Sequence, residues 1–190
     1  MQALRATQEQ THFTYADYAK LKTKERYEVI DGGAYMMAAP SISQQRISRE
    51  FTRQFANFLA GKTCEVFAAP VDVCLNALGD DDYDVLQPDL IIVCDRPKLD
   101  GKRCNGAPDM VIEIISPSSS RMDRFTKLSK YQKTGVREYW IVDSDLKTVH
   151  AFILENGKYF VTVYGDTDTA PVSVLAGCEI NLAGVFAGIE

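Results

Sequence analysis

The feature that most constrains the fold is an apolar run with a single carboxylate in its middle. Residues 108–116 read Pro-Asp-Met-Val-Ile-Glu-Ile-Ile-Ser. Such a run is typical of a strand covered on both faces, on which Val111, Glu113 and Ile115 share one side. A buried carboxylate is costly unless it is paired or binds a cation. Three interpretations of Glu113 stay open from the residues alone: a functional site, a buried ion pair, or an edge strand that faces solvent.

The order of the expected elements predicts an α/β (α+β) fold with a mixed central sheet flanked by helices. Ser41 and Gln44 have the spacing of a capping box, and Gly32-Gly33 and Asn156-Gly157 are turn signals. The expected helices are 14–22, 41–60 and 121–134, and the expected strands are 26–31, 34–38, 64–75, 87–95, 108–116, 138–143, 148–154 and 159–164.

Length and composition predict one ordinary domain. The 190 residues suit a single domain over 1–190, with a flexible polar end at 1–12. No run approaches the roughly 20 apolar residues of a membrane helix, and no secretory signal is evident. The five cysteines are scattered without a zinc-ligand spacing, which fits a reducing cytoplasm. The net charge of −5 argues against wholesale coating of nucleic acid but allows a local basic surface.

Two Pro-Asp pairs are candidates to act with Glu113. Asp109 lies four residues earlier on the same strand, roughly 13 Å away at about 3.3 Å per residue, which is too far to share an ion. Asp89 opens the preceding strand, and neighbouring strands lie about 4.8 Å apart, so we prefer the pair Asp89 and Glu113. Lys127 follows on the next helix, with Asp123 and Tyr131 one turn away on either side. An ordinary surface ion pair of Lys127 with Asp123 is the alternative.

These residues resemble a known family over most of the chain, from about residue 13 onward. The stretch 108–119, then Asp123, Lys127, Tyr131 and Glu-Tyr-Trp-Ile-Val-Asp at 138–143, is similar to the Uma-two family of restriction-endonuclease-like proteins. The segments 27–32, 39–41 and 87–90 fit the same family.

The resemblance implies a PD-(D/E)xK nuclease core that uses Mg²⁺ or Mn²⁺. Asp89 and Glu113 would be the metal-binding carboxylates, joined by the backbone carbonyl of Ile114. Ile115 stands where such cores usually have the lysine, so the resemblance assigns that role to Lys127. Glu28 is a candidate additional acidic residue. Gln44-Gln45 departs from the family, whose members commonly have a histidine at the start of this helix.

Basic residues beside this cluster predict contact with nucleic acid. The helix after Glu113 supplies Arg121, Arg124 and Lys130, and a second stripe consists of Arg46, Arg49 and Arg53. We therefore expect a Mg²⁺-dependent DNA endonuclease that acts as a cytoplasmic homodimer. The alternative is a catalytically inactive nuclease-fold protein that serves as an oligomeric or nucleic-acid-binding module.

Overall fold

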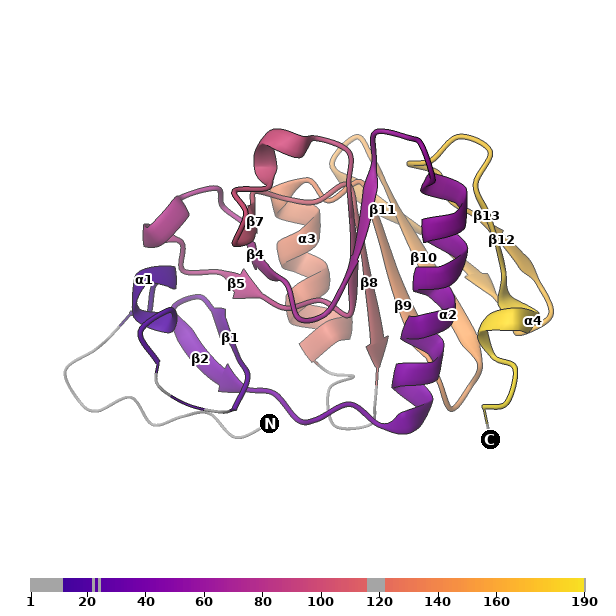
Figure 1. The fold of residues 1–190 in the computed structure, drawn as a ribbon, viewed down its shortest axis with the longest axis horizontal. Helices are drawn as coiled ribbons and strands as arrows, with labels where there is room; N and C mark the ends of the chain where they lie inside the picture. The colour runs from indigo at the N-terminus through magenta and orange to yellow at the C-terminus, as the bar shows by residue number, and fades with distance from the viewer. Residues whose placement is uncertain (1–11, 22, 24, 116–121, 190) are drawn as a thin grey trace.

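The computed structural model describes residues 12–21, 23, 25–115 and 122–189, with the side chains of 122–124 left out. A six-stranded sheet lies at its centre, and a five-stranded sheet lies beside it (Figure 1). In spatial order, the six strands are β11 (Lys158–Tyr164), β10 (Thr148–Glu155), β9 (Glu138–Asp143), β8 (Met110–Ile115), β6 (Leu90–Val93) and β3 (Glu65–Ala68). The five strands are β2 (Gly33–Met36), β1 (Tyr27–Ile30), β5 (Val85–Leu86), β4 (Asp72–Cys74) and β7 (Arg103–Asn105).

Short elements complete the chain. A two-stranded sheet near the C-terminus pairs β12 with β13. The helices and remaining strands are α1 (Tyr15–Tyr18), α2 (Ile42–Leu59), α3 (Leu128–Thr134), α4 (Leu182–Val185), β12 (Thr169–Pro171) and β13 (Glu179–Asn181). A π-helical turn, η3 (Met122–Lys127), leads directly into α3, and the short 3-10 turns are η1 (Gly79–Asp81) and η2 (Arg96–Lys98).

The strand β8 is central. It runs antiparallel to β6 and parallel to β9, and all six of its residues are buried. The parallel connection to β9 passes through η3 and α3, as a parallel pair requires a crossover. The interpretation of β8 as an edge strand with Glu113 facing solvent is therefore wrong, because β8 is paired with β6 on one side and with β9 on the other.

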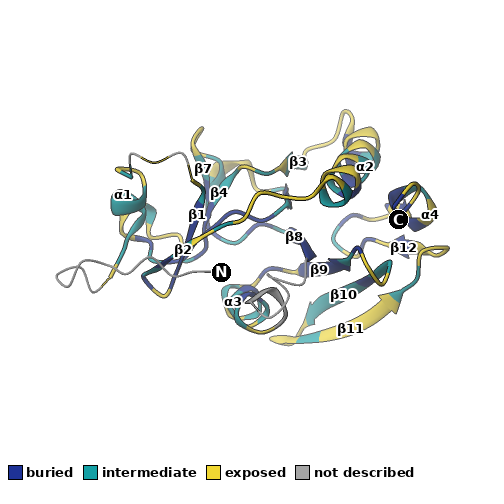
Figure 2. Cartoon of the chain, turned by 90° about the horizontal axis from the view of Figure 1, so that it is seen from below, coloured by how far each residue is buried: buried dark blue, intermediate teal, exposed yellow. Residues whose placement is uncertain are grey.

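Different layers cover the two faces of the six-stranded sheet. Figure 2 shows α2 and α3 on opposite sides of β8 and β9. On one face, Phe51 and Phe55 of α2 pack with Ile112 and Trp140. On the other face, the layer that includes Tyr131 packs with residues of the five-stranded sheet. Glu113 lies on this second face by strand alternation, between α3 and the five-stranded sheet.

Several local predictions are confirmed, and others are wrong in extent. The capping box starts α2 as expected, with Ser41 accepting a hydrogen bond from the backbone of Gln44. Helix 14–22 shortens to α1. The expected strand 64–75 divides at the cis Ala69–Pro70 bond, so that β3 joins the six-stranded sheet and β4 the five-stranded one. Proline donates no backbone hydrogen bond, which favours this break.

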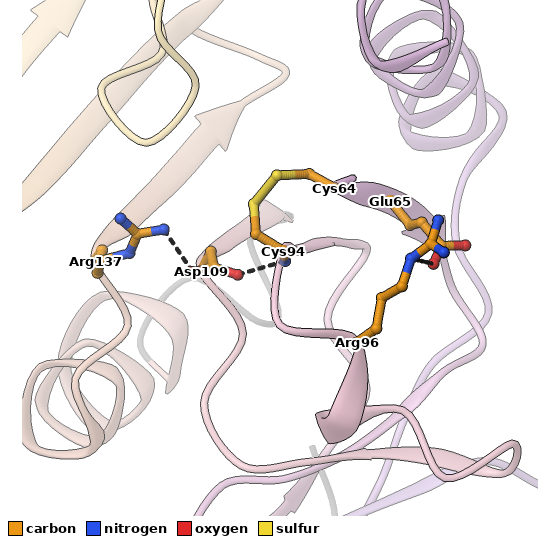
Figure 3. Close-up of a disulfide and its surroundings, with 6 residues drawn as sticks. All are labelled: Cys64, Glu65, Cys94, Arg96, Asp109 and Arg137. Carbon is orange, nitrogen blue, oxygen red and sulfur yellow. Dashed lines mark hydrogen bonds and ion pairs between the residues drawn. A yellow bond between two sulfur atoms is a disulfide. The ribbon is translucent and has the colours of Figure 1, made fainter. Parts of the chain in front are cut away.

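The cysteines depart from the expectation of a uniformly reduced set. Cys64 and Cys94 form a disulfide between the start of β3 and the end of β6 (Figure 3). The antiparallel register pairs Glu65 with Val93, so the two cysteines come opposite each other one step further along. Cys74, Cys104 and Cys178 are free and buried. Within the described ranges, no helix is both long and apolar enough to span a membrane.

Candidate active site

The structure brings Asp89 and Glu113 together at the end of the β6–β8 ladder. Leu90 pairs with Ile112, which places Asp89 opposite Glu113 in the next register position. The Oδ2 atom of Asp89 accepts the backbone N–H of Ile114 at 2.7 Å. This hydrogen bond fixes the first carboxylate against the strand that carries the second. Asp89 is half-buried, whereas Glu113 is only 5% exposed.

Lys127 joins the two sheets through two carboxylates. Its Nζ donates hydrogen bonds of 2.9 Å to Oε1 of Glu113 and of 2.9 Å to Oε1 of Glu28. Glu28 lies on β1, so the lysine bridges the five-stranded and the six-stranded sheets. All three side chains are buried, and this contact replaces the alternative in which Lys127 forms an exposed surface pair.

Tyr131 is a further partner of Glu113, whose role the sequence does not reveal. Its hydroxyl donates to the same Oε1 of Glu113 at 2.9 Å. Burial, and then the negative charge of Glu113, raise the pKa of Tyr131 well above its usual value. The phenol therefore stays a protonated donor that orients the carboxylate. Its signals in the sequence are its spacing of one helical turn from Lys127 and its place in the family resemblance, and neither predicts this contact.

Glu28 is fully buried and incompletely bonded. Its Oε1 accepts the backbone N–H of Gln87 at 2.9 Å in addition to the bond from Lys127. Its Oε2 is buried and has no hydrogen-bond partner among the described residues. Such an atom is rare in folded proteins and calls for an explanation such as an ion or a proton.

Carboxylates predominate among these four groups. Asp89, Glu113 and Glu28 contribute three carboxylates, and Lys127 contributes one ammonium. Carboxylates gathered in a largely buried place favour a nearby cation. A divalent ion is one that the pairing of Asp89 with Glu113 would suit.

The backbone carbonyl of Ile114 is held by Gln44. The side-chain Nε2 of Gln44 donates to this carbonyl at 2.8 Å, while its Oε1 accepts the backbone N–H of Ser41. The same glutamine thus starts α2 and fixes the strand next to Glu113. The sequence predicts its place in the capping box and its departure from the family, but not this contact with β8.

The donor set fits a hard divalent cation. Carboxylate and carbonyl oxygens are the ligands that Mg²⁺ prefers, and Mg²⁺ usually takes one or two carboxylates and keeps several waters. Asp89, Glu113 and the carbonyl of Ile114 are consistent with that pattern. Over the described residues, no group of three or more His, Cys, Asp or Glu side chains is arranged to hold a metal by itself.

The structure does not show a free basic surface formed by the described residues among Arg121, Arg124 and Lys130. Arg121 lies outside the described residues, and the side chain of Arg124 is outside them as well. Lys130 is paired with Asp31 and Asp84, at 2.7 Å from an oxygen of each, and its side chain is 12% exposed. Burial lowers the pKa of Lys130, but the hydrogen bonds to the two carboxylates outweigh burial and raise it overall. Its charge is therefore already engaged.

Comparisons with known proteins give one family, a relative in sequence and a similar solved structure. A model described as "Uma2: Putative restriction endonuclease" matches residues 14–183. "Uncharacterized protein slr1290" of Synechocystis sp. is 27% identical over 149 residues, which cover 77% of this chain and 76% of that protein. A crystal structure of "a putative nuclease belonging to DUF820" from Anabaena variabilis superposes with a TM-score of 0.72 at 21% identity, covering 92% of this chain and 97% of that one. The chain has the restriction-endonuclease-like fold and belongs to the Uma2 family of nuclease-like proteins.

Proposed function

We propose that this protein is a Mg²⁺-dependent endonuclease that hydrolyses phosphodiester bonds of DNA. The single observation that carries the proposal is that Lys127 hydrogen-bonds both Glu113 and Glu28 in a buried place, while Asp89 lies opposite Glu113 on the neighbouring strand. The family description and the nuclease neighbour support the same reaction class.

The proposed metal ligands are Asp89, Glu113 and the carbonyl oxygen of Ile114. Bound Mg²⁺, or Mn²⁺ in its place, supplies Lewis-acid charge neutralisation and a more acidic water. The chain prepares this site in advance. Asp89 is fixed by the N–H of Ile114, and Glu113 is oriented by Tyr131.

Lys127 supplies the positive charge that phosphodiester hydrolysis needs. Water forms a new bond to phosphorus while the bond to the leaving sugar oxygen breaks, and negative charge on the phosphate oxygens increases. A preorganised ammonium stabilises that charge in a site that excludes bulk water. Glu28 acts as a positioning residue, because it is the second carboxylate that accepts a hydrogen bond from Nζ.

Cleavage of supercoiled plasmid tests this function. With Mg²⁺ or Mn²⁺, we expect the wild type to convert supercoiled DNA into open circles, and Glu113→Gln to lower that rate on the order of 10³-fold. Glu179→Gln makes the same chemical change at an exposed position on β13 and is expected to retain the wild-type rate. Wild-type cleavage by Glu113→Gln, or equal cleavage in EDTA, would contradict the proposal.

We also propose a homodimer, because cutting both strands of a duplex requires either two active sites or two successive cleavage events at one active site. The edge strand β11 supports it, since Phe160, Val161 and Val163 are each more than half exposed there. An unpaired apolar edge is a ready surface for pairing between chains. Light scattering coupled to size-exclusion chromatography is expected to give a molar mass of twice the chain mass for the wild type. The Val161→Lys variant is expected to have the mass of one chain. A monomeric wild type would contradict the dimer without touching the nuclease proposal.

A further inference from the structure

We propose that a groove between α2 and the β3–β4 turn binds the sugar-phosphate backbone of a DNA strand and guides it to Asp89. This inference rests on the proposed function for its choice of DNA. It assigns the substrate contact to a different helix from the one favoured by the sequence.

The groove is a cavity of about 460 Å³ that reaches the proposed active site. One wall is α2, and another part of the lining is Ala68 at the end of β3 with Ala69 in the β3–β4 turn. Asp89 also belongs to the lining. Cavities of roughly 300–1,000 Å³ are typical of ligand sites. A nucleotide unit entering here would therefore lie against one of the proposed metal ligands.

The polar wall comes from one stripe of α2. Gln45, Arg49, Thr52 and Ala56 follow one another at spacings of three or four residues, so they lie on one side of the helix and all line the cavity. The opposite side of α2 carries Phe51 and Phe55 into the core. Because Phe51 and Phe55 face the core, the stripe on the other side of α2 faces the cavity next to Asp89.

Charge identifies the ligand class. Arg26, Arg49 and Arg53 line the cavity, against the single carboxylate of Asp89. Such a basic lining next to a carboxylate fits phosphate groups on the way to a metal site. Phosphate contacts of this kind position nucleic acid independently of its sequence.

Arg49 is the cation best placed for this contact. It is exposed and forms no hydrogen bond or ion pair with any described residue. Arg53 is 2.6 Å from Glu50, and Arg26 donates from Nε to Gln87 at 2.8 Å. A DNA phosphate would therefore engage Arg49 without breaking an existing pair.

Other basic places in the described part of the chain are less suited. Lys130 is held by Asp31 and Asp84. A larger cavity of about 560 Å³ contains Arg137 and Asp109, but it includes neither Asp89 nor Glu113 in its lining. Arg46 donates to the carbonyl of Gly188 and is not part of the groove.

Binding of a fluorescein-labelled 20-base-pair DNA duplex, measured by anisotropy in EDTA at several salt concentrations, tests the groove. Removing one cation that neutralises a phosphate is expected to reduce the slope of log affinity against log salt by about 0.9. For Arg49→Ala, we expect about tenfold weaker binding at low salt and a slope that is about 0.9 shallower. Arg49→Lys keeps the charge and is expected to recover most of the slope.

Lys102→Ala is the matched control, because it removes an exposed cation between η2 and β7, outside the groove lining and away from β11. We expect wild-type affinity and slope for it. Equal affinity and slope for the wild type and Arg49→Ala would overturn the groove, as would a wild type that does not bind the duplex.

Plasmid cleavage in Mg²⁺ separates this inference from the proposed function. If the wild type nicks DNA and Arg49→Ala leaves binding and nicking unchanged, the nuclease proposal stands and the proposed role of the groove in DNA binding is contradicted. A protein that binds through Arg49 yet nicks no better than Glu113→Gln would keep the groove and overturn the hydrolytic function.

Discussion

The two ends of β8 carry carboxylates in contrasting surroundings. Asp109 precedes the first residue of the strand, and Glu113 lies near its other end, four residues later on the same face. Both belong to a sheet with covered faces, and both accept hydrogen bonds from the protein. They differ in how their charge is compensated.

Asp109 is a balanced carboxylate. Its Oδ2 accepts the backbone N–H of Cys94 at 2.6 Å, and its Oδ1 accepts from Arg137 at 2.5 Å (Figure 3). One negative charge therefore meets one positive charge, and each oxygen has a donor. This arrangement ties the start of β8 to the end of β6 and to the segment before β9.

Glu113 shares the ammonium of Lys127 with Glu28, and Asp89 lies opposite it. Three carboxylates therefore gather at this end of the strand, and two of them share one ammonium. A buried carboxylate alone does not mark a site, as Asp109 shows. What distinguishes the Glu113 end is this gathering of carboxylates, the type of ligand that a divalent cation prefers.

The sharpest test exchanges the charged carboxyl for an amide at each end. Glu113→Gln is expected to lower nicking on the order of 10³-fold. Its effect on stability is expected to be the smaller of the two, because Lys127 keeps its ion pair with Glu28 and the amide oxygen can still accept from Tyr131. Asp109→Asn is expected to keep nicking within about twofold but to lower the free energy of unfolding by about 1.5–3 kcal/mol, since it removes a charge-assisted hydrogen bond. Urea denaturation and plasmid nicking measure the two effects. Slower nicking by Asp109→Asn than by Glu113→Gln would mean that the two ends of β8 do not have the roles assigned to them.

Glu28→Gln tests whether the second carboxylate on Lys127 supports metal binding. We expect it to raise the Mg²⁺ concentration for half-maximal nicking by about 10- to 100-fold, because residues behind a metal site commonly have effects of that size. Titration of MgCl₂ against the nicking rate measures it, with Glu179→Gln as control. An unchanged requirement for Mg²⁺ would mean that Glu28 only supports the fold.

Divalent ions are expected to stabilise the folded protein through the Glu113 end alone. At one hundred times the dissociation constant, a bound ion adds about 2.7 kcal/mol to the free energy of unfolding. MgCl₂ is therefore expected to raise the melting temperature of the wild type and of Asp109→Asn, but not of Glu113→Gln. KCl at equal ionic strength controls for screening. A similar rise in all three proteins would show that the ion binds elsewhere.

Tyr131→Phe is expected to have the smallest effect. Removing one hydrogen bond to Glu113 should slow nicking by about tenfold or less. Because burial and the charge of Glu113 raise the pKa of Tyr131, its hydroxyl stays protonated at least up to about pH 10. The rate–pH profiles of the wild type and the variant are therefore expected to have the same shape. A decline in activity near that pH in the wild type alone would assign Tyr131 a role as an ionising group.

Much of the fold is predictable because its signals are local. The capping box of α2, the Asn156-Gly157 turn and the apolar run of β8 each lie within a few residues, and the structure confirms them. The strand around Pro70 is predicted less well. Whether its two halves stay in one sheet depends on partners that lie far along the chain.

Alternation along an apolar run was enough to put Glu113 on one face of a buried strand, strand spacing favoured Asp89 as its partner, and the family resemblance assigned Lys127. The contact of Glu28 with that lysine, and that of Gln44 with the carbonyl of Ile114, became visible only in the folded chain. The register of β3 with β6 likewise brought Cys64 to Cys94. Local spacing places side chains on a single element, whereas contacts between elements depend on the register and packing of segments that are distant in sequence.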